Sequence, residues 1–322
     1  MLRVGIIGGG FGLIGLKPAF GSVRGCRVVG VCGGREDWRT FLERNNLDAI
    51  ALAVPPKTQY EIAKAAIERE LHVFAEKPLA ANLAQAKQLY ALAKKNRVVT
   101  GIDFEFPEIA EWKKVKELLD KKKFGALKHV SVDWDWLSGD LKYGRKTWKT
   151  NVKEGGGALS FYFSHGLYYL EHFAGKIQKT QALFSHSPLS LNGGEVGVDM
   201  LLKFKSGTTG NVHVSCNSTG LIRHRLMFLC ERGVIVLENR NAIVDNFDIK
   251  TYGAHGTRIV KVKRDKGRKG EDERVKIVRK LAKKFIDACT RKKQMVPSFV
   301  DGLRVQELIE TIRREALRSV TK

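Results

Sequence analysis

The chain of 322 residues lacks the features that define several protein classes. Its five cysteines are widely spaced and form no C-x-x-C pair, which argues against a disulfide scaffold and against a zinc ribbon. No apolar run reaches the ~20 residues that a membrane-spanning helix needs. Acidic residues are few, 34 against 57 lysines and arginines. We therefore expect a cytoplasmic protein with reduced thiols, no membrane partner and a strongly basic surface.

The formal net charge of +23 raises the question of a nucleic-acid partner. Basic residues concentrate at 121–123 and 258–293, but acidic residues interrupt the second stretch and no aromatic residues alternate with it. This pattern is more typical of a solvated lysine-rich face, so nucleic acid is not the expected partner. A positive field would still attract phosphorylated ligands within a screening length of ~8 Å.

Motifs for metal or nucleophilic chemistry are also missing. His165 and His172 are seven residues apart without an H-E-x-x-H frame, and there is no nucleophile elbow or P-loop lysine. We therefore expect no metal site.

A glycine-rich turn close to the amino terminus is the most informative feature present. Residues 2–7 have the composition of a buried strand, and a helical stretch follows the turn. Closely spaced glycines let a backbone approach a pyrophosphate, which the N–H groups and dipole of the helix then bind. Two registers of the fingerprint remain open, one starting at Gly8 and one at Gly10. The residues expected to contact a dinucleotide here are Gly8, Gly10, Phe11, Gly12 and Gly15.

Strands and helices alternate through the first 104 residues, which is typical of a parallel, doubly wound sheet. Later segments alternate apolar and polar residues with a period of two, which predicts an antiparallel sheet with one face open to water. Two helices close the chain, the second starting at Ser298-x-x-Asp301. The expected fold is α/β plus α+β. It combines a doubly wound parallel sheet over residues 1–104, which the family resemblance described below implies is a Rossmann domain, with a carboxy-terminal open antiparallel sheet domain (105–322).

Several motifs together resemble the glucose-fructose oxidoreductase / inositol dehydrogenase / MocA (GFO/IDH/MocA) family. They span most of the chain at the family's separations. They are Gly8-Gly9-Gly10-Phe11-Gly12, Asp48-Ala49-Ile50 leading to Val54-Pro55-Pro56, Glu76-Lys77-Pro78, Gly155-Gly156-Gly157-Ala158-Leu159 with His165, and the closing segment 297–304.

The resemblance implies NAD(P) bound across the first domain and substrate bound between the two domains. It implies hydride transfer on a sugar, a sugar nucleotide or a cyclitol, with Val54, Pro55, Pro56, Glu76 and Lys77 near the cofactor. It also implies that the final helix, 299–319, packs back toward the Rossmann domain. Homodimers or homotetramers are expected to form through the carboxy-terminal sheet.

Lys77 and His165 match the family's catalytic lysine and histidine. Oxidation of an alcohol needs a proton acceptor as the hydride leaves, and a partly buried lysine can have a pKa lowered toward the working range. A surface lysine beside a turn is the alternative for Lys77. For His165 the alternative is a core histidine on an apolar helix.

The histidine lacks its usual acidic neighbours. The family's aspartate four residues earlier is Phe161 here, and the acidic residue three positions later is Tyr168. Tyr162 or Tyr168 could replace the acid, since a phenol both donates and accepts a proton. The alternative is a non-catalytic sensor or scaffold that binds NAD(P).

The segment between Cys32 and Asp48 is too short for the family's helix, strand and helix, so one strand–helix unit is expected to be missing. The second strand ends in Gly33-Gly34-Arg35, so no acid stands at its end to bind the ribose 2′-hydroxyl. We expect a slight preference for NADP over NAD, although a plain surface role for Arg35 remains open.

Overall fold

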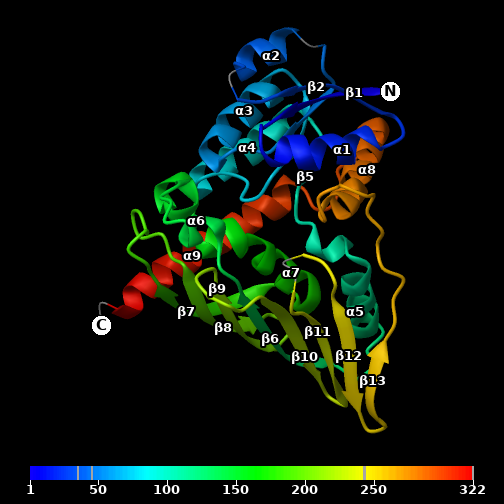
Figure 1. Cartoon of the computed structure of the whole chain (residues 1–322), viewed down its shortest axis with the longest axis vertical. Coiled ribbons are helices and arrows are strands. Elements are labelled where there is room, and N and C mark those ends of the chain that lie inside the picture. Colours follow the sequence, from blue (N-terminus) through cyan, green and yellow to red (C-terminus); the bar gives the residue numbers. More distant parts are fainter. Residues whose placement is uncertain (35, 45, 242–243, 321–322) are drawn as a thin grey trace. The chain divides into compact units, whose positions relative to one another are not determined.

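The computed structural model describes residues 1–34, 36–44, 46–241 and 244–320 (Figure 1). It divides into two compact units. The first contains Met1–Glu105 and Lys266–Glu307, and the second contains Phe106–Asp265 and the residues from Leu308 on. The sequence prediction assigned 105–322 to one domain, whereas residues 266–307 belong with the first unit. The reason is packing, because the helix in this segment completes the core of the first unit.

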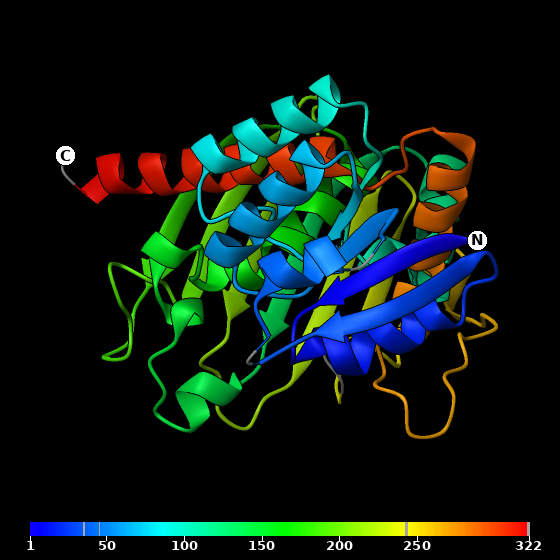
Figure 2. The same cartoon turned by 90° about the horizontal axis from the view of Figure 1, so that it is seen from above.

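The first unit is built on a five-stranded sheet of order β2-β1-β3-β4-β5, parallel in every pair. Its strands are β1 (Leu2–Ile7), β2 (Cys26–Cys32), β3 (Ala49–Leu52), β4 (His72–Ala75) and β5 (Thr100–Ile102). Its helices are η1 (Gly12–Leu16), α1 (Lys17–Gly21), α2 (Trp38–Arg44), α3 (Pro56–Glu68), α4 (Leu83–Lys95) and α8 (Val275–Arg291). Figure 2 shows α3 and α4 on one face of this sheet and α1 on the other. The expected doubly wound Rossmann sheet is confirmed.

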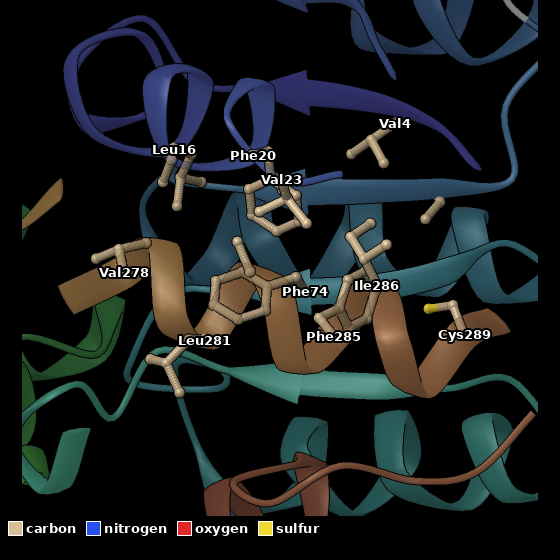
Figure 3. Close-up of a cluster of buried hydrophobic side chains, with 14 of the residues drawn as sticks. Val4, Leu16, Phe20, Val23, Phe74, Val278, Leu281, Phe285, Ile286 and Cys289 are labelled. Carbon is tan, nitrogen blue, oxygen red and sulfur yellow. The ribbon is translucent and has the colours of Figure 1, made fainter. Parts of the chain in front are cut away.

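The apolar core of the first unit joins α8 to α1 and the sheet. Phe20 of α1, Phe74 of β4 and Phe285 of α8 meet edge to face, with ring centroids 5.4 to 6.1 Å apart. Leu281 and Ile286 extend the contact along α8 (Figure 3). Each buried side chain of this size contributes about 1.5–3 kcal/mol, which explains why α8 belongs to this unit.

Between β2 and β3 the described residues form one helix, α2, and β2 is the outermost strand. The described residues of this connection therefore contain no strand that could extend the sheet beyond β2, where the sequence led us to expect a missing strand–helix unit. The last strand of this sheet, β5, is short and covers only Thr100–Ile102.

The second unit contains an eight-stranded sheet of order β13-β12-β11-β10-β6-β9-β8-β7. Its strands are β6 (Leu127–Asp135), β7 (Ile177–Ser185), β8 (Gly197–Phe204), β9 (Thr209–Ser215), β10 (Arg223–Cys230), β11 (Gly233–Asn239), β12 (Asp248–Gly253) and β13 (Gly256–Val260). The expected open antiparallel sheet is present, and one pair of its strands departs from the pattern, because β6 and β9 run parallel. A parallel neighbour requires a crossover, and the chain between these two strands includes α7 (Ser164–Ala174) and two further strands.

Alternation along β6 separates a buried face from an open face, as the sequence predicts. Val130, Val132 and Trp134 are buried in the core, whereas His129 and Ser131 are only partly buried. Figure 1 shows α5 (Ala110–Asp120) and α7 over the core face of the sheet. None of the described helices combines the length and hydropathy of a membrane span.

Candidate active site

The turn after β1 has a shape that fits a diphosphate. Gly8 has a φ of +144°, and a Cβ there would lie 2.3 Å from the carbonyl oxygen of Ala53. Only glycine tolerates this approach. At Gly10, by contrast, a Cβ would meet no atom within 4 Å. The turn is therefore closed on the side of β3 and open at Gly10, as a backbone cradle for a pyrophosphate requires.

Phe11 and Gly15 pack against each other rather than standing apart. A Cβ at Gly15 would lie 2.1 Å from the Phe11 ring. The guanidinium of Arg274 lies 4.0 Å from the centroid of the same ring, and Asp272 accepts two hydrogen bonds of 2.8 Å from Arg274. Arg274 was not predicted as a site residue, because its basic segment resembled a solvated surface.

The connection from β3 to α3 holds the next part of the site in place. Pro55 caps α3, and Pro56 is its first residue. The buried side-chain amide of Gln59 donates to the carbonyl oxygens of Glu76, Pro78 and Leu79 at 2.7, 3.0 and 3.1 Å. Gln59 thus links the Val54-Pro55-Pro56 segment to the loop that carries Lys77.

Lys77 lies at the carboxyl edge of the sheet among acidic side chains. Ala75 of β4 pairs with Ile102 of β5, so Glu76 and Asp103 emerge side by side from neighbouring strands. Asp103 and Glu105 are only 2% and 5% exposed, and Lys77 is half-buried. Buried carboxyl groups are uncommon unless they are paired.

Burial sets the protonation of this cluster. Desolvation lowers the pKa of Lys77, and the charges of Glu76, Glu105 and Asp103 oppose this shift. Burial raises the pKa of Asp103 well above its usual range, and the neighbouring Glu76 and Glu105 raise it further. Burial also raises the pKa of Glu105 to about 8. The sheet edge thus holds a lysine that gives up its proton more easily than a free one. Beside it lie Glu105, with a pKa of about 8, and Asp103, with a raised pKa.

Arg35, the residue predicted to favour NADP, lies outside the described residues.

In the second unit, the triple-glycine segment is built around a buried ion pair. A Cβ at Gly157 would lie 2.5 Å from the carboxylate of Glu195, which is 3% exposed. Glu195 accepts from the N–H of Leu159 at 3.0 Å and pairs with Arg313 at 2.7 Å. Arg313 also donates to the carbonyl oxygen of Gly156 at 2.8 Å. This motif therefore has a structural role that sequence reasoning missed.

His165 is a buried residue of α7, with its ring 5.1 Å from that of Phe106. Tyr162 is the last residue of η5 (Ala158–Tyr162). The centroid of its ring lies 4.7 Å from that of Trp136 and 4.4 Å from that of Phe161. Burial raises the pKa of Tyr162 above its usual value. Tyr162 can therefore donate a hydrogen bond at neutral pH but is a poor proton acceptor. Tyr168 is half-buried on α7.

Phe161, at the position of the family's aspartate, belongs to an aromatic row. Its ring lies 4.8 Å from that of Trp148, and the Lys149 ammonium lies 5.2 Å from its centroid. Trp148, Phe161 and Tyr162 are all half-buried, so the row presents aromatic surface.

The basic stretch from Arg258 to Lys293 does not belong to a single body. Residues up to Asp265 lie in the second unit and those from Lys266 in the first. Arg264 pairs with Glu111 at 3.0 Å and Arg279 with Glu271 at 2.7 Å. Acidic neighbours within each unit therefore pair with part of this positive charge.

Two family models match the chain. Residues 2–104 match the oxidoreductase family with an NAD-binding Rossmann fold, and residues 112–236 match the GFO/IDH/MocA carboxy-terminal domain. The fold and these matches define an oxidoreductase with a nicotinamide-dinucleotide domain. The chain belongs to the GFO/IDH/MocA family, as the sequence motifs indicate.

The chain is similar in sequence to other oxidoreductases and in fold to solved dehydrogenase structures. The chain is 27% identical to an uncharacterized oxidoreductase of Synechocystis sp., over 85% of this chain and 78% of that protein. It is 23% identical to levoglucosan dehydrogenase of Pseudarthrobacter phenanthrenivorans, over 62% of this chain and 57% of that one. A levoglucosan dehydrogenase complex with NADH and levoglucosan superposes with a TM-score of 0.84 at 19% identity, covering 98% and 97% of the two chains.

Proposed function

We propose that this protein is an NAD(P)-dependent oxidoreductase that transfers a hydride to or from a hydroxyl-bearing carbon of a sugar, sugar nucleotide or cyclitol. The observation that carries the proposal is Lys77. It is a half-buried lysine with a lowered pKa at the carboxyl edge of a Rossmann sheet. Gln59 holds its loop by donating to the backbone carbonyl oxygens on both sides of Lys77. Ligands of such sheets bind at that edge.

In this proposal the first unit binds the cofactor. Gly8, Gly10 and Gly12 would contact the diphosphate, and Val54 to Pro56 and Glu76 would line the path toward the reactive ring. When bound, the nicotinamide supplies the hydride acceptor or donor. Lys77 holds the proton of the substrate hydroxyl, taking it during oxidation and returning it during reduction.

The second unit is proposed to bind the substrate. Aromatic surface suits the apolar C–H face of a sugar, and the row of Trp148, Phe161 and Tyr162 provides it. His165 would assist proton transfer, with Tyr162 or Tyr168 as a hydrogen-bond donor in place of the missing aspartate. The names of similar proteins support this class, since they include dehydrogenases of levoglucosan and D-xylose and a reductase of a dTDP-linked sugar.

The finer assignments are also proposals. A slight preference for NADP is supported by the absence of an acid in Cys32-Gly33-Gly34 and by Arg35 after it. The net charge is compatible with a phosphorylated or nucleotide-linked substrate. Homo-oligomers through the open sheet face are supported by Leu183 and Leu201, which are 68% and 61% exposed. The cytoplasmic location stays a prediction.

Phe161 supports a second candidate function, a sensor or scaffold that binds NAD(P) without turnover. Phe161 stands where the resemblance implies an aspartate that carries a proton, and its ring packs against Trp148 and Tyr162 instead.

Turnover and binding separate the two candidates. The protein would be assayed with NAD(P)⁺ against levoglucosan, D-xylose, myo-inositol, glucose 6-phosphate and UDP-glucose, while cofactor binding is followed by thermal shift. Reduction of the cofactor with any of these sugars, lost in Lys77→Met, supports the enzyme. Binding without turnover across the panel supports the sensor, and no binding at all contradicts both.

A further inference from the structure

Asp103 and Glu105 form an acidic group beside Lys77 that no catalytic assignment above uses. Asp103 follows β5 directly, and its N–H donates to the carbonyl oxygen of Ala75 at 2.9 Å. This bond places the Asp103 side chain next to Glu76 and the start of the Lys77 loop. Glu105 is two residues further along and is nearly as buried.

The contacts of these acids require a shared proton. The side chains of Asp103 and Glu76 are hydrogen-bonded to each other. Two carboxylates repel, so a hydrogen bond between them needs a proton on one of them. Within the described part of the chain, Asp103 Oδ1 and Glu105 Oε2 have no hydrogen-bond partner. The cluster therefore has room to accept a proton.

The charges around Glu105 suit reversible protonation. Lys77 and Arg274 are the cations of the cluster, and Glu76, Asp103 and Asp272 are its other acids. Asp272 already binds Arg274 through two hydrogen bonds. Burial places the pKa of Glu105 at about 8, and a proton carrier works best when its pKa is close to the working pH.

We infer that Glu105 is the proton acceptor behind Lys77, next to the pair of Asp103 and Glu76 that shares a proton. This inference rests on the proposed function. During oxidation the C–H bond breaks and the hydride passes to the nicotinamide dinucleotide, while the hydroxyl proton forms an N–H bond with the neutral Lys77 amine. An N–H bond of the resulting ammonium then breaks, an O–H bond forms on Glu105, and Glu105 releases the proton to water. Reduction runs through the same steps in reverse.

The electrostatic coupling between Glu105 and Lys77 can be tested without a substrate. Competitive labelling of Lys77 by acetic anhydride, followed by mass spectrometry across pH, measures the pKa of the Lys77 amine. Glu105→Gln removes a negative charge beside the ammonium, so the labelling pKa of Lys77 should fall relative to the wild type. Glu111→Gln is the matched control, because Glu111 is a buried carboxylate of the second unit that pairs with Arg264. An unchanged labelling pKa in Glu105→Gln overturns the inference.

Turnover tests the proton step with the sugar that the wild type oxidises in the panel above. We expect Glu105→Gln to lower kcat at pH 8 by ~100-fold and to flatten the pH profile, while the affinities for NADH and NADPH stay unchanged. Glu105→Asp should recover most of the rate because it keeps a carboxylate. A Glu105→Gln enzyme with the wild-type rate and pH profile overturns the inference but leaves the proposed function standing. A wild type that binds no dinucleotide contradicts the proposed function instead, and labelling still reports on Glu105.

Discussion

At the residue scale, the site depends on side chains whose protonation is set by burial. Lys77 is the clearest case, since desolvation lowers its pKa while three carboxyl groups oppose the shift. A lysine in this state can act as a base at a pH where an exposed lysine is fully protonated. The sequence indicated Lys77 through the Glu76-Lys77-Pro78 motif. The motif itself gave no sign of how many acids surround Lys77.

Replacing Lys77 tests its role directly. Lys77→Met keeps the length of the side chain and removes the amine, so turnover should fall by ~10²–10⁴-fold while cofactor binding remains. Lys87→Met is the control, because Lys87 is exposed on α4. Steady-state kinetics and a dinucleotide titration measure the two effects. In the wild type, oxidation should rise with pH through a pKa below the 10.5 of a free lysine.

His213 offers a prediction about stability and pH. Its Nδ1 lies 2.6 Å from Asp199 and its Nε2 3.2 Å from Asp135. Burial lowers the pKa of His213, but hydrogen bonds and charge from Asp199 and Asp135 raise it overall. Because the folded state binds this proton more tightly, the stabilisation is fully present below the unfolded pKa of ~6.5 and is lost as pH rises through the raised folded pKa.

Urea unfolding at pH 5.5 and pH 9 checks the sign of this effect. His213→Asn should reduce the free energy of unfolding more at pH 5.5, by less than ~1 kcal/mol because the pair is partly exposed. The exposed His255→Asn variant is the control. A larger loss at pH 9 would mean that His213 is not held as a cation.

At the element scale, the glycine motifs position the neighbouring elements. Gly8 lets the turn after β1 approach the end of β3, and Gly157 admits the carboxylate of Glu195. Local patterns predicted the strands, the turns and the Ser298–Asp301 cap, where the Ser298 N–H donates to the Asp301 carboxylate at 2.8 Å. They could not predict the pair of Glu195 with Arg313, because these residues are far apart in the sequence. The Asp103-x-Glu105 pattern after a buried strand was a usable signal that sequence reasoning missed.

The ion pair of Arg313 should matter for folding. Arg313→Ala leaves the buried Glu195 carboxylate without its cation and should reduce the free energy of unfolding by about 3–5 kcal/mol. Arg304→Ala, at a more exposed pair with Glu307 on the same helix, α9 (Phe299–Val320), should cost less than ~1 kcal/mol. Chemical denaturation of both variants measures the difference, and equal losses would contradict a structural role for this pair.

At the scale of the whole molecule, composition and pattern predicted two fold types but not their boundaries. The apolar stripe of α8 predicts a buried face but does not indicate which core buries it. The sequence therefore gave no reason to group residues 266–307 with residues 1–105, as the structure does. The parallel pairing of β6 with β9 was unpredictable for a similar reason, since strand order in a sheet depends on contacts between distant segments. Local patterns alone did not identify the family. The family was indicated by several motifs that occur together at the family's spacing along the chain.

The open face of the eight-stranded sheet gives a prediction about assembly. Leu183 and Leu201 lie on the neighbouring strands β7 and β8 and are largely exposed, and a homo-oligomer through this face would cover them. Leu201→Glu should then lower the mass measured by light scattering, whereas Leu221→Glu, in the loop before β10, should not. A wild-type monomer would contradict this proposal.

The most direct test of the account is dinucleotide binding by a pair of glycine variants. A Cβ meets no protein atom within 4 Å at Gly10 or at Gly21, so Gly10→Val and Gly21→Val should both fold. In thermal-shift titrations with NAD(H) and NADP(H), the wild type and Gly21→Val should gain ~2.7 kcal/mol of stability when the preferred cofactor is at a hundred times its Kd. Gly10→Val should gain none, because its side chain would occupy the place proposed for the diphosphate. No shift in the wild type with any of the four dinucleotides, or an undiminished shift in Gly10→Val, would contradict the proposal that this turn binds the cofactor.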